Sequence, residues 1–315
     1  MANEAISTIS VPKKQADNPS RLRRRNRIRS TLNAYLYLAP TILGLLIFSA
    51  GAIIASFFIS FTNWQLVLPP VWIGLKNYTN LLQLPEFWQV LRNTIYYTAG
   101  YVPLAVTLPL FMAMLVNQKL KGITFFRTTY FLPVVTSGVA IALVWGWMYN
   151  PSFGVINYLL KTLFGIDGPR WLADPKWAMP SLIIIGVWQS VGYNMVIYLA
   201  GLQGIPQELY EAARMDGAGW WPQFRHITVP LITPTAFFIL VLSVIGSFQV
   251  WTITYLLTQG GPAGATLTLS YYIYQQGFEW FHMGFAAALA YVLFGIVFVV
   301  TMIQFKLQKQ WVFYH

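Results

Sequence analysis

The chain has no cysteine among its 315 residues and carries very little charge. The missing thiols exclude disulfides, thiolate metal sites and cysteine nucleophiles. Its three histidines, His226, His282 and His315, are widely spaced, so no two of them form a metal-ligand pair. Charged residues make up only 9% of the chain, whereas a soluble domain carries about a quarter. These absences argue against a metalloenzyme and against a soluble globular protein.

Sequence motifs of catalysis are missing as well. The chain contains no phosphate-binding GxxxxGK[ST] loop, no HExxH and no set of nucleophile and base. We therefore expect that the chain is not an enzyme and has no catalytic residue, metal ligand or cofactor of its own. Any process driven by ATP would need a separate ATPase.

Long apolar segments dominate the sequence. Hydrophobic residues make up 57% of the chain, and six segments contain no Asp, Glu, Lys or Arg. Each is near or above the roughly 20 residues that a bilayer-spanning helix needs. The sequence therefore predicts an all-α, polytopic integral membrane protein with six transmembrane helices. We place the spans at residues 34–62, 93–117, 128–150, 178–203, 228–258 and 282–305.

Basic residues are distributed unequally between the two sides of these spans. Eight of the 20 Lys and Arg lie in the tail, residues 1–30, and seven more lie in segments 118–127, 204–227 and 306–315. The segments on the other side hold five. By the positive-inside rule, the tail and both ends of the chain are cytoplasmic. No aromatic residue interleaves with the basic tail, so we expect no nucleic-acid partner despite the net charge of +11.

The loop at residues 204–230 differs from its surroundings in charge. It holds three of the chain's nine acidic residues and lies between two apolar spans. Pro206 suits the first position of a helix, residues 209–215 contain no helix breaker, and Gly217 and Gly219 supply a stop. We predict a helix, a turn and a second short helix on the cytoplasmic face. These features also fit a solvated amphipathic connector.

A spaced set of residues in this loop carries a family resemblance. Glu211-Ala212-Ala213, three residues, Gly217, nine residues, Ile227, one residue and Val229-Pro230 resembles the EAA motif of binding-protein-dependent ABC importer permeases, with Val229 in place of Leu. The resemblance implies a type I ABC importer permease fold. It further implies that the loop forms coupling helices that dock on an ATP-binding subunit, with Glu211 as the charged contact and Gly217 as the bend. The coupling residues so implied are Glu211, Ala212, Ala213, Asp216, Gly217, Ile227 and Pro230.

Other segments extend the resemblance over most of the chain. Residues 61–64, 74–78 and 258–262 look like loops of carbohydrate-type permeases, so we place the six-span permease domain at residues 31–310. The chain resembles the compact six-span subunits, similar to multiple-sugar and glycerol-3-phosphate permeases. The resemblance implies a protein of the plasma (inner) membrane. Its implied partners are a second homologous permease subunit, two ATP-binding subunits that carry ATP and Mg, an extracytoplasmic solute-binding protein and membrane lipid.

Polar residues inside two spans are candidates for the solute path. In the fourth span, Gln189 and Tyr193, like Ser190 and Asn194, are four residues apart, so the four share one helix face. Amides, hydroxyls and aromatic faces suit a sugar, and resemblance to maltose-type permeases implies solute contacts near 189–194 and 247–251. The same residues also fit helix–helix packing. The candidate path residues are Gln189, Tyr193, Asn194, Ser247, Gln249 and Trp251.

The sequence leaves the identity of the solute open. We expect a sugar or sugar-like solute that passes by alternating access, with a glycerol-3-phosphate, phosphodiester or polyol importer of the same class as the alternative. An ion-coupled secondary transporter is an alternative from a different class. That class normally needs an ionisable residue inside a span, and only His282 lies near one.

Overall fold

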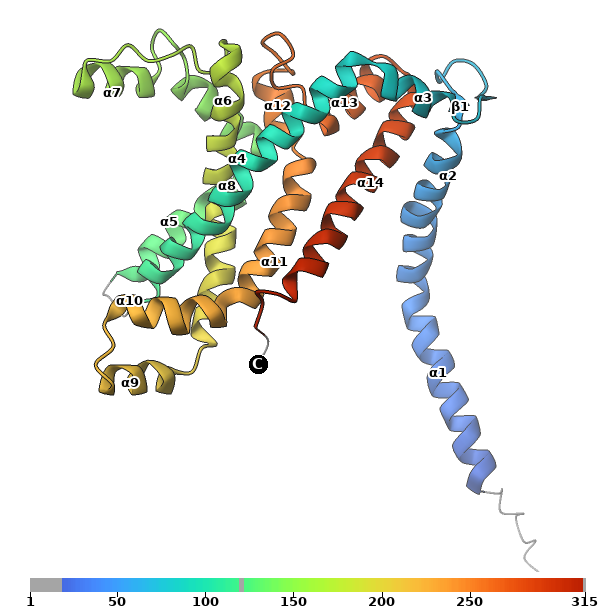
Figure 1. Cartoon of the computed structure of the whole chain (residues 1–315). Coiled ribbons are helices and arrows are strands. Elements are labelled where there is room, and N and C mark those ends of the chain that lie inside the picture. The colour runs from blue at the N-terminus through green and yellow to red at the C-terminus, as the bar shows by residue number, and fades with distance from the viewer. Residues whose placement is uncertain (1–18, 119–121, 314–315) are drawn as a thin grey trace, which may run out of the picture. The chain divides into compact units, whose positions relative to one another are not determined.

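The computed structural model describes residues 19–118 and 122–313, with backbone only for residues 19–27 and 29 (Figure 1). The chain divides into two compact units, Met1–Ser56 and Phe57–His315, which are described separately. Apart from one short hairpin, the regular elements of the described residues are helical. This confirms the predicted all-α class.

The described part of the first unit is helical throughout, and it is apolar from Ser30 onward. α1 (Pro19–Gly44) continues through a π-helical segment, η1 (Leu45–Gly51), into α2 (Ala52–Ile59), whose last residues belong to the second unit. These elements contain a candidate span at Ser30–Ile59 with a mean hydropathy of 2.5, close to the predicted 34–62. Of the predicted basic tail, residues 1–18 lie outside the described residues, and residues 19–30 belong to α1, since arginine and leucine favour the helix.

The second unit holds the remaining helices and the hairpin, in which β1 pairs antiparallel with β2. Its elements in chain order are β1 (Thr62–Asn63), β2 (Val71–Trp72), α3 (Lys76–Gln83), α4 (Pro85–Val116), α5 (Ile123–Val135), α6 (Gly138–Met148), α7 (Val155–Phe164), α8 (Pro175–Gln203), α9 (Gln207–Met215), α10 (Trp220–Gln223), η2 (Phe224–Thr228), α11 (Val229–Phe248), α12 (Thr252–Leu257), α13 (Leu269–Tyr274), η3 (Gln275–Glu279) and α14 (Met283–Gln308).

α4 and α8 form the centre of the second unit and pack along each other more extensively than any other pair of its described helices. One buried cluster around Leu182 and Ile185 and another around Met195 and Tyr198 line their shared length. Gly192 brings α8 close to α5, because a Cβ atom there would clash with the carbonyl oxygen of Tyr130. Close helix contacts at small residues are typical of membrane bundles.

Five helical segments of the described residues are long and apolar enough to cross a membrane, and the number is six if the bent pair α5–α6 is one span. The predicted third span, residues 128–150, is therefore not a single straight helix, because α5 and α6 meet at 101°. Thr136 is extended (φ −82°, ψ 138°), and Pro133 in the last turn of α5 has no N–H for the Thr129 carbonyl, which weakens this end of the helix. The chain turns at this point before α6 begins.

The predicted fifth span, residues 228–258, is also interrupted. α11 ends at Phe248, and α12 begins only at Thr252. Figure 1 shows α12 and α13 at one end of the second unit and α9 and α10 at the opposite end. The second unit thus carries a broken helix near one end and the acidic loop at the other.

Candidate functional site

The fifth span is interrupted at residues 249–251, and hydrogen bonds from residues 268–270 stabilise this interruption. The Ser270 hydroxyl donates to the Phe248 carbonyl at 3.1 Å, and the Thr268 hydroxyl donates to the Val250 carbonyl at 3.0 Å. These side chains satisfy carbonyls that the interrupted helix leaves without intrahelical partners. Non-helical backbone at membrane depth is tolerated where it is buried in protein or lines a cavity. The interrupted backbone at residues 249–251 is therefore a candidate for the lining of a binding pocket.

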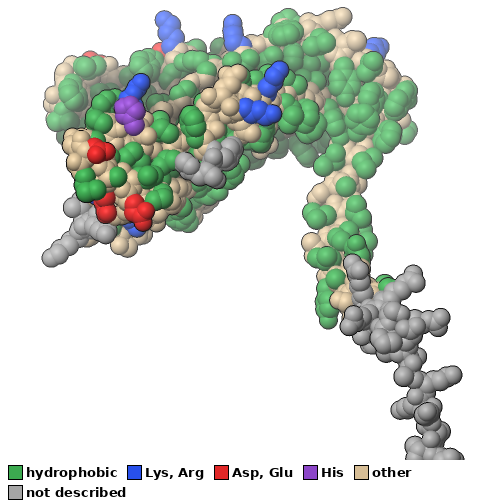
Figure 2. Space-filling view, turned by 60° about the horizontal axis from the view of Figure 1, so that its bottom comes forward, with side chains coloured by type: hydrophobic (Ala, Val, Ile, Leu, Met, Phe, Trp, Pro, Cys, Tyr) green, Lys and Arg blue, Asp and Glu red, His purple; other side chains and the backbone are tan. Residues whose placement is uncertain are grey.

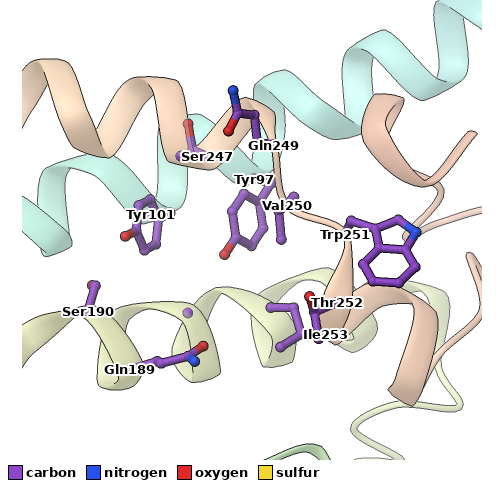
Figure 3. Close-up of a pocket in the computed structure, with 12 residues that line it drawn as sticks. Tyr97, Tyr101, Gln189, Ser190, Ser247, Gln249, Val250, Trp251, Thr252 and Ile253 are labelled. Carbon is purple, nitrogen blue, oxygen red and sulfur yellow. The ribbon is translucent and has the colours of Figure 1, made fainter. Parts of the chain in front are cut away.

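A pocket of about 310 Å³ lies between this break and the centres of α4 and α8 (Figure 3). It is open to solvent and has no charged residue in its lining. The lining residues come from α4, α8, the end of α11, the break and the start of α12. They are Tyr97, Tyr101, Gly186, Gln189, Ser190, Gly246, Ser247, Gln249, Val250, Trp251, Thr252 and Ile253.

The polar groups of the pocket are neutral donors and acceptors. The side-chain amides of Gln189 and Gln249 form no hydrogen bond with any residue that the structure describes. The Ser247 hydroxyl is engaged at 2.7 Å with the Val244 carbonyl and at 3.0 Å with the Thr98 hydroxyl. The two amides are therefore among the groups available to bind a polar solute.

Aromatic rings form two walls of the pocket. Tyr97 and Tyr101 stack with centroids 5.5 Å apart and planes 11° apart, and a Cβ atom at Gly186 would clash with the Tyr97 hydroxyl. Trp251 stacks on Tyr255 at 5.2 Å and 7°. Its indole nitrogen is buried without a hydrogen-bond partner among the described residues. Flat aromatic faces beside free amides suit a ring that carries hydroxyl groups.

The α13 segment that packs against Trp251 is anchored to the start of α4. The Tyr272 hydroxyl donates to the Glu86 carboxylate at 3.2 Å. Burial, together with the Glu86 charge, raises the pKa of Tyr272 to about 12, so the phenol stays protonated and keeps donating. The Asn93 amide also donates to the Gly264 and Leu267 carbonyls, at 2.7 and 3.0 Å. These bonds fix the segment whose hydroxyls hold the break.

The structure brings together four of the six predicted path residues: Gln189, Ser247, Gln249 and Trp251 all line the pocket. Asn194 does not, because its amide is buried and donates to the Ala105 carbonyl of α4 at 2.9 Å. Tyr193 is half exposed and also lies outside the pocket lining. Of the four residues predicted to share one face of the fourth span, Gln189 and Ser190 line the pocket, whereas the two residues one turn further along do not. Sequence reasoning missed Tyr97 and Tyr101, although two tyrosines four residues apart in an apolar span were a usable signal.

The predicted coupling loop is a helix, a left-handed turn and a second helix. Pro206 precedes α9 instead of occupying its first turn, because its ψ of 129° is extended. Gly217 has a φ of +79°, a conformation that favours glycine. The Ala218 N–H donates to the Ala213 carbonyl at 2.8 Å and closes the end of α9. Gly217 therefore forms the bend, where the sequence predicted it.

The residues of the resemblance divide between an exposed face and a packed face. Glu211, Ala212, Asp216 and Gly217 are exposed, while Ala213 and Pro230 are partly buried. Ile227 packs on the buried cluster that contains Ile205, Leu202 and Tyr198. Figure 2 shows acidic side chains gathered among apolar ones at this end of the second unit. One face of the loop is therefore exposed, and the other packs against the ends of the apolar helices.

No group of His, Cys, Asp and Glu among residues 19–118 and 122–313 could hold a metal ion. The described pocket has uncharged side chains in its lining, and the loop at α9–α10 lies apart from it.

Residues 94–310 match the family described as binding-protein-dependent transport system inner membrane component. The probable ABC transporter permease protein YesP of Bacillus subtilis (strain 168) is 40% identical over 291 residues, which cover 91% of this chain and 93% of that protein. The lactose transport system permease protein LacF of Rhizobium radiobacter is 38% identical over 285 residues, which cover 89% of this chain and 95% of that protein. A chain in the crystal structure of a bacterial alginate ABC transporter, in complex with an alginate pentasaccharide-bound periplasmic protein, aligns with a TM-score of 0.79 and 25% identity over 90% of this chain and 96% of that chain.

The apolar helices and the pocket beside a broken span define a multi-pass membrane transport protein. The chain belongs to the binding-protein-dependent inner membrane component family, and it is a permease subunit of an ABC importer. Such a subunit is the non-catalytic membrane component of its transporter and lies in the inner membrane. The resemblance, the fold class and the expectation that the chain is not an enzyme are thereby confirmed.

Proposed function

We propose that this permease passes a sugar or sugar-like solute across the inner membrane by alternating access, driven by a separate ATPase docked on the α9–α10 loop. The observation that carries the choice of solute is the uncharged pocket at the break in the fifth span, where the free amides of Gln189 and Gln249 lie with the rings of Tyr97, Tyr101 and Trp251. Amides bind hydroxyl groups, and aromatic faces pack against the C–H faces of a sugar ring.

The relatives support the same solute class. LacF is named as a lactose permease, and the aligned crystal structure is that of an alginate importer. Both names describe carbohydrates, although the two solutes differ in size and charge. A lining without Lys or Arg suits a neutral sugar better than a phosphorylated one. A polyol remains the alternative within the class, and membership of an ABC family argues against ion coupling.

The coupling assignment supplies the partners. Glu211, Ala212, Asp216 and Gly217 present an exposed face on which an ATP-binding subunit would dock. ATP and Mg would bind to two such subunits, not to this chain. A second homologous permease would complete the membrane part, and an extracytoplasmic binding protein would deliver the solute. Both chain ends and the α9–α10 loop would then be cytoplasmic, as the basic residues indicate.

The direct test is uptake by the complete transporter. The chain and its partner subunits would be reconstituted in vesicles with ATP inside, and a panel of labelled mono- and oligosaccharides, polyols and glycerol phosphates would be compared. We expect ATP-dependent uptake of a neutral sugar, and about tenfold less uptake in Gln249→Ala if it removes one hydrogen bond to the solute. Gln65→Ala, in an exposed amide outside the pocket, is the matched control. Transport of glycerol phosphates alone would overturn the sugar assignment.

A further inference from the structure

A second polar cavity of about 740 Å³ lies beside the coupling loop. Its walls come from the end of α4, the start of α5, the end of α8 and the helices α9 and α10. Two arginines, Arg127 and Arg214, line it together with five side-chain amides, and no Asp or Glu does. A cavity of this size and composition differs from the sugar pocket, because here the polar groups include two positive charges.

Both guanidinium groups are held in place by backbone carbonyls. Arg127 donates from Nη2 to the Val116 carbonyl at 2.7 Å, and Arg214 donates from Nε to the Tyr210 carbonyl at 3.2 Å. Neither forms an ion pair with a carboxylate of the described residues. The Nε atom of Arg127 is buried and has no hydrogen-bond partner in that part of the chain. The two charges are therefore fixed in position but not neutralised.

The acidic residues of the α9–α10 loop do not neutralise the two arginines. Glu208, Glu211 and Asp216 are exposed and absent from the cavity lining. Their side chains lie outside the cavity, whereas Gln207, Tyr210 and Arg214 belong to its wall. The wall of the cavity thus has uncompensated positive charge and several amide donors.

We propose that this cavity binds a phosphate-type oxyanion at the cytoplasmic ends of the spans. A guanidinium group matches the geometry of a phosphate, and charge-assisted hydrogen bonds are the strong ones. The group could belong to the headgroup of an anionic phospholipid, since basic pockets between membrane helices bind such headgroups on the cytoplasmic side. It could equally belong to a soluble phosphorylated metabolite. The chemistry of recognition is the same in both cases.

Occupancy of the cavity would affect coupling because its walls belong to different helices. Gln207, Tyr210 and Arg214 lie on the docking helix α9, whereas Arg127 lies at the start of α5. An oxyanion that bridges the two arginines ties α9 to the spans. If the distance between these walls changes during transport, the oxyanion favours the conformation in which both arginines reach it. The cavity is then a place where lipid composition or metabolic state adjusts the transport rate.

Binding to the purified full-length chain tests this proposal without any transport assay. The chain would be placed in nanodiscs of phosphatidylcholine alone or with phosphatidylglycerol, and its thermal unfolding would be followed by tryptophan fluorescence. Inorganic phosphate would be titrated into the phosphatidylcholine discs as the soluble probe. The variants are Arg127→Gln and Arg214→Gln. The matched control is Arg225→Gln, which removes an exposed arginine of η2 that does not line the cavity.

We expect a stabilising ligand whose apparent affinity falls about tenfold or more in Arg127→Gln and Arg214→Gln and is unchanged in Arg225→Gln. Stabilisation by phosphatidylglycerol identifies the lipid headgroup as the source, and stabilisation by inorganic phosphate identifies a soluble anion. Arg214 is exposed, so its variant should fold even if Arg127→Gln does not. Equal responses of the wild type and Arg214→Gln to both probes would overturn the proposal.

Discussion

The hydroxyl groups of Tyr210 and Thr228 lie 2.9 Å apart and share a hydrogen bond. Tyr210 belongs to α9, the exposed helix of the docking loop, and Thr228 is the buried last residue of η2, directly before α11. Eighteen positions separate the two residues along the chain. This bond connects α9, the helix on which we propose that an ATPase docks, with the start of the broken fifth span, whose other end borders the pocket.

Removing this link should weaken coupling. Tyr210→Phe keeps the ring in its cluster but deletes the bond, at a cost of about 0.5–1.5 kcal/mol. We expect fewer solute molecules transported per ATP hydrolysed, measured as the ratio of uptake to phosphate release in vesicles. Thr228→Ser, which keeps the hydroxyl, should behave like the wild type. An unchanged ratio in Tyr210→Phe would show that force passes by another route.

The exposed face of α9 should be required for ATP-driven uptake. Glu211→Lys reverses the charge of an exposed residue and should abolish uptake while the chain still inserts in the membrane. Insertion is measured by the amount of chain in the membrane fraction, and uptake with a labelled solute. Glu279→Lys, which changes an exposed acid of η3 outside the α9–α10 loop, is the matched control. Normal ATP-driven transport by Glu211→Lys would remove the coupling assignment.

The bend at Gly217 should depend on backbone conformation, since a Cβ atom there would meet no other atom within 4 Å. At a φ of +79° a β-branched residue is strained by about 1–2 kcal/mol. We expect Gly217→Val to impair docking and uptake, and Gly217→Asn to retain more of both because asparagine tolerates this region. Copurification of the ATPase subunits measures docking. Equal activity of the two variants would contradict the role of the turn.

Alanine substitutions of Asn194 and Gln249 should have different effects, the first on stability and the second on transport. Asn194→Ala removes the bond to the Ala105 carbonyl, so we expect a stability loss of about 0.5–1.5 kcal/mol with the same preference among solutes. Gln249 is exposed in the pocket and forms no hydrogen bond with the described residues. Its alanine variant should change uptake kinetics without changing thermal unfolding. The reverse pattern would assign Gln249 to packing and Asn194 to the solute path.

The complete assembly should be recovered from the membrane in mild detergent. We expect this chain to copurify with a second, homologous permease and two copies of an ATP-binding subunit, measured by mass spectrometry of the intact complex. Glu211→Lys should lose the ATP-binding subunits but keep the second permease, because the loop and the spans bind different partners. A stable homodimer of this chain as the sole membrane part would contradict the heteromeric arrangement.

The sequence alone determined the features that depend on composition and local spacing. Uncharged segments of membrane length predicted the helical class, because hydrocarbon demands long apolar helices. The spacing from Glu211 to Pro230 carried the family resemblance, which implied a bend at Gly217, and glycine adopts the positive φ found there without strain. These features can be read from the sequence because they depend on composition and on the local order of residues, not on tertiary contacts.

Only the tertiary structure decided where the helices break and which polar residues meet. Nothing local at residues 249–251 signals an interruption, which is held by hydroxyls of Thr268 and Ser270 from a later segment. Gln189 and Asn194 carry the same chemistry on one helix, but packing against α4 buries only Asn194. Tyr97 joins the pocket because Gly186 leaves room for its hydroxyl. Whether a polar side chain is buried or lines the pocket depends on the helix that packs against it. A local sequence pattern does not show which helix that is.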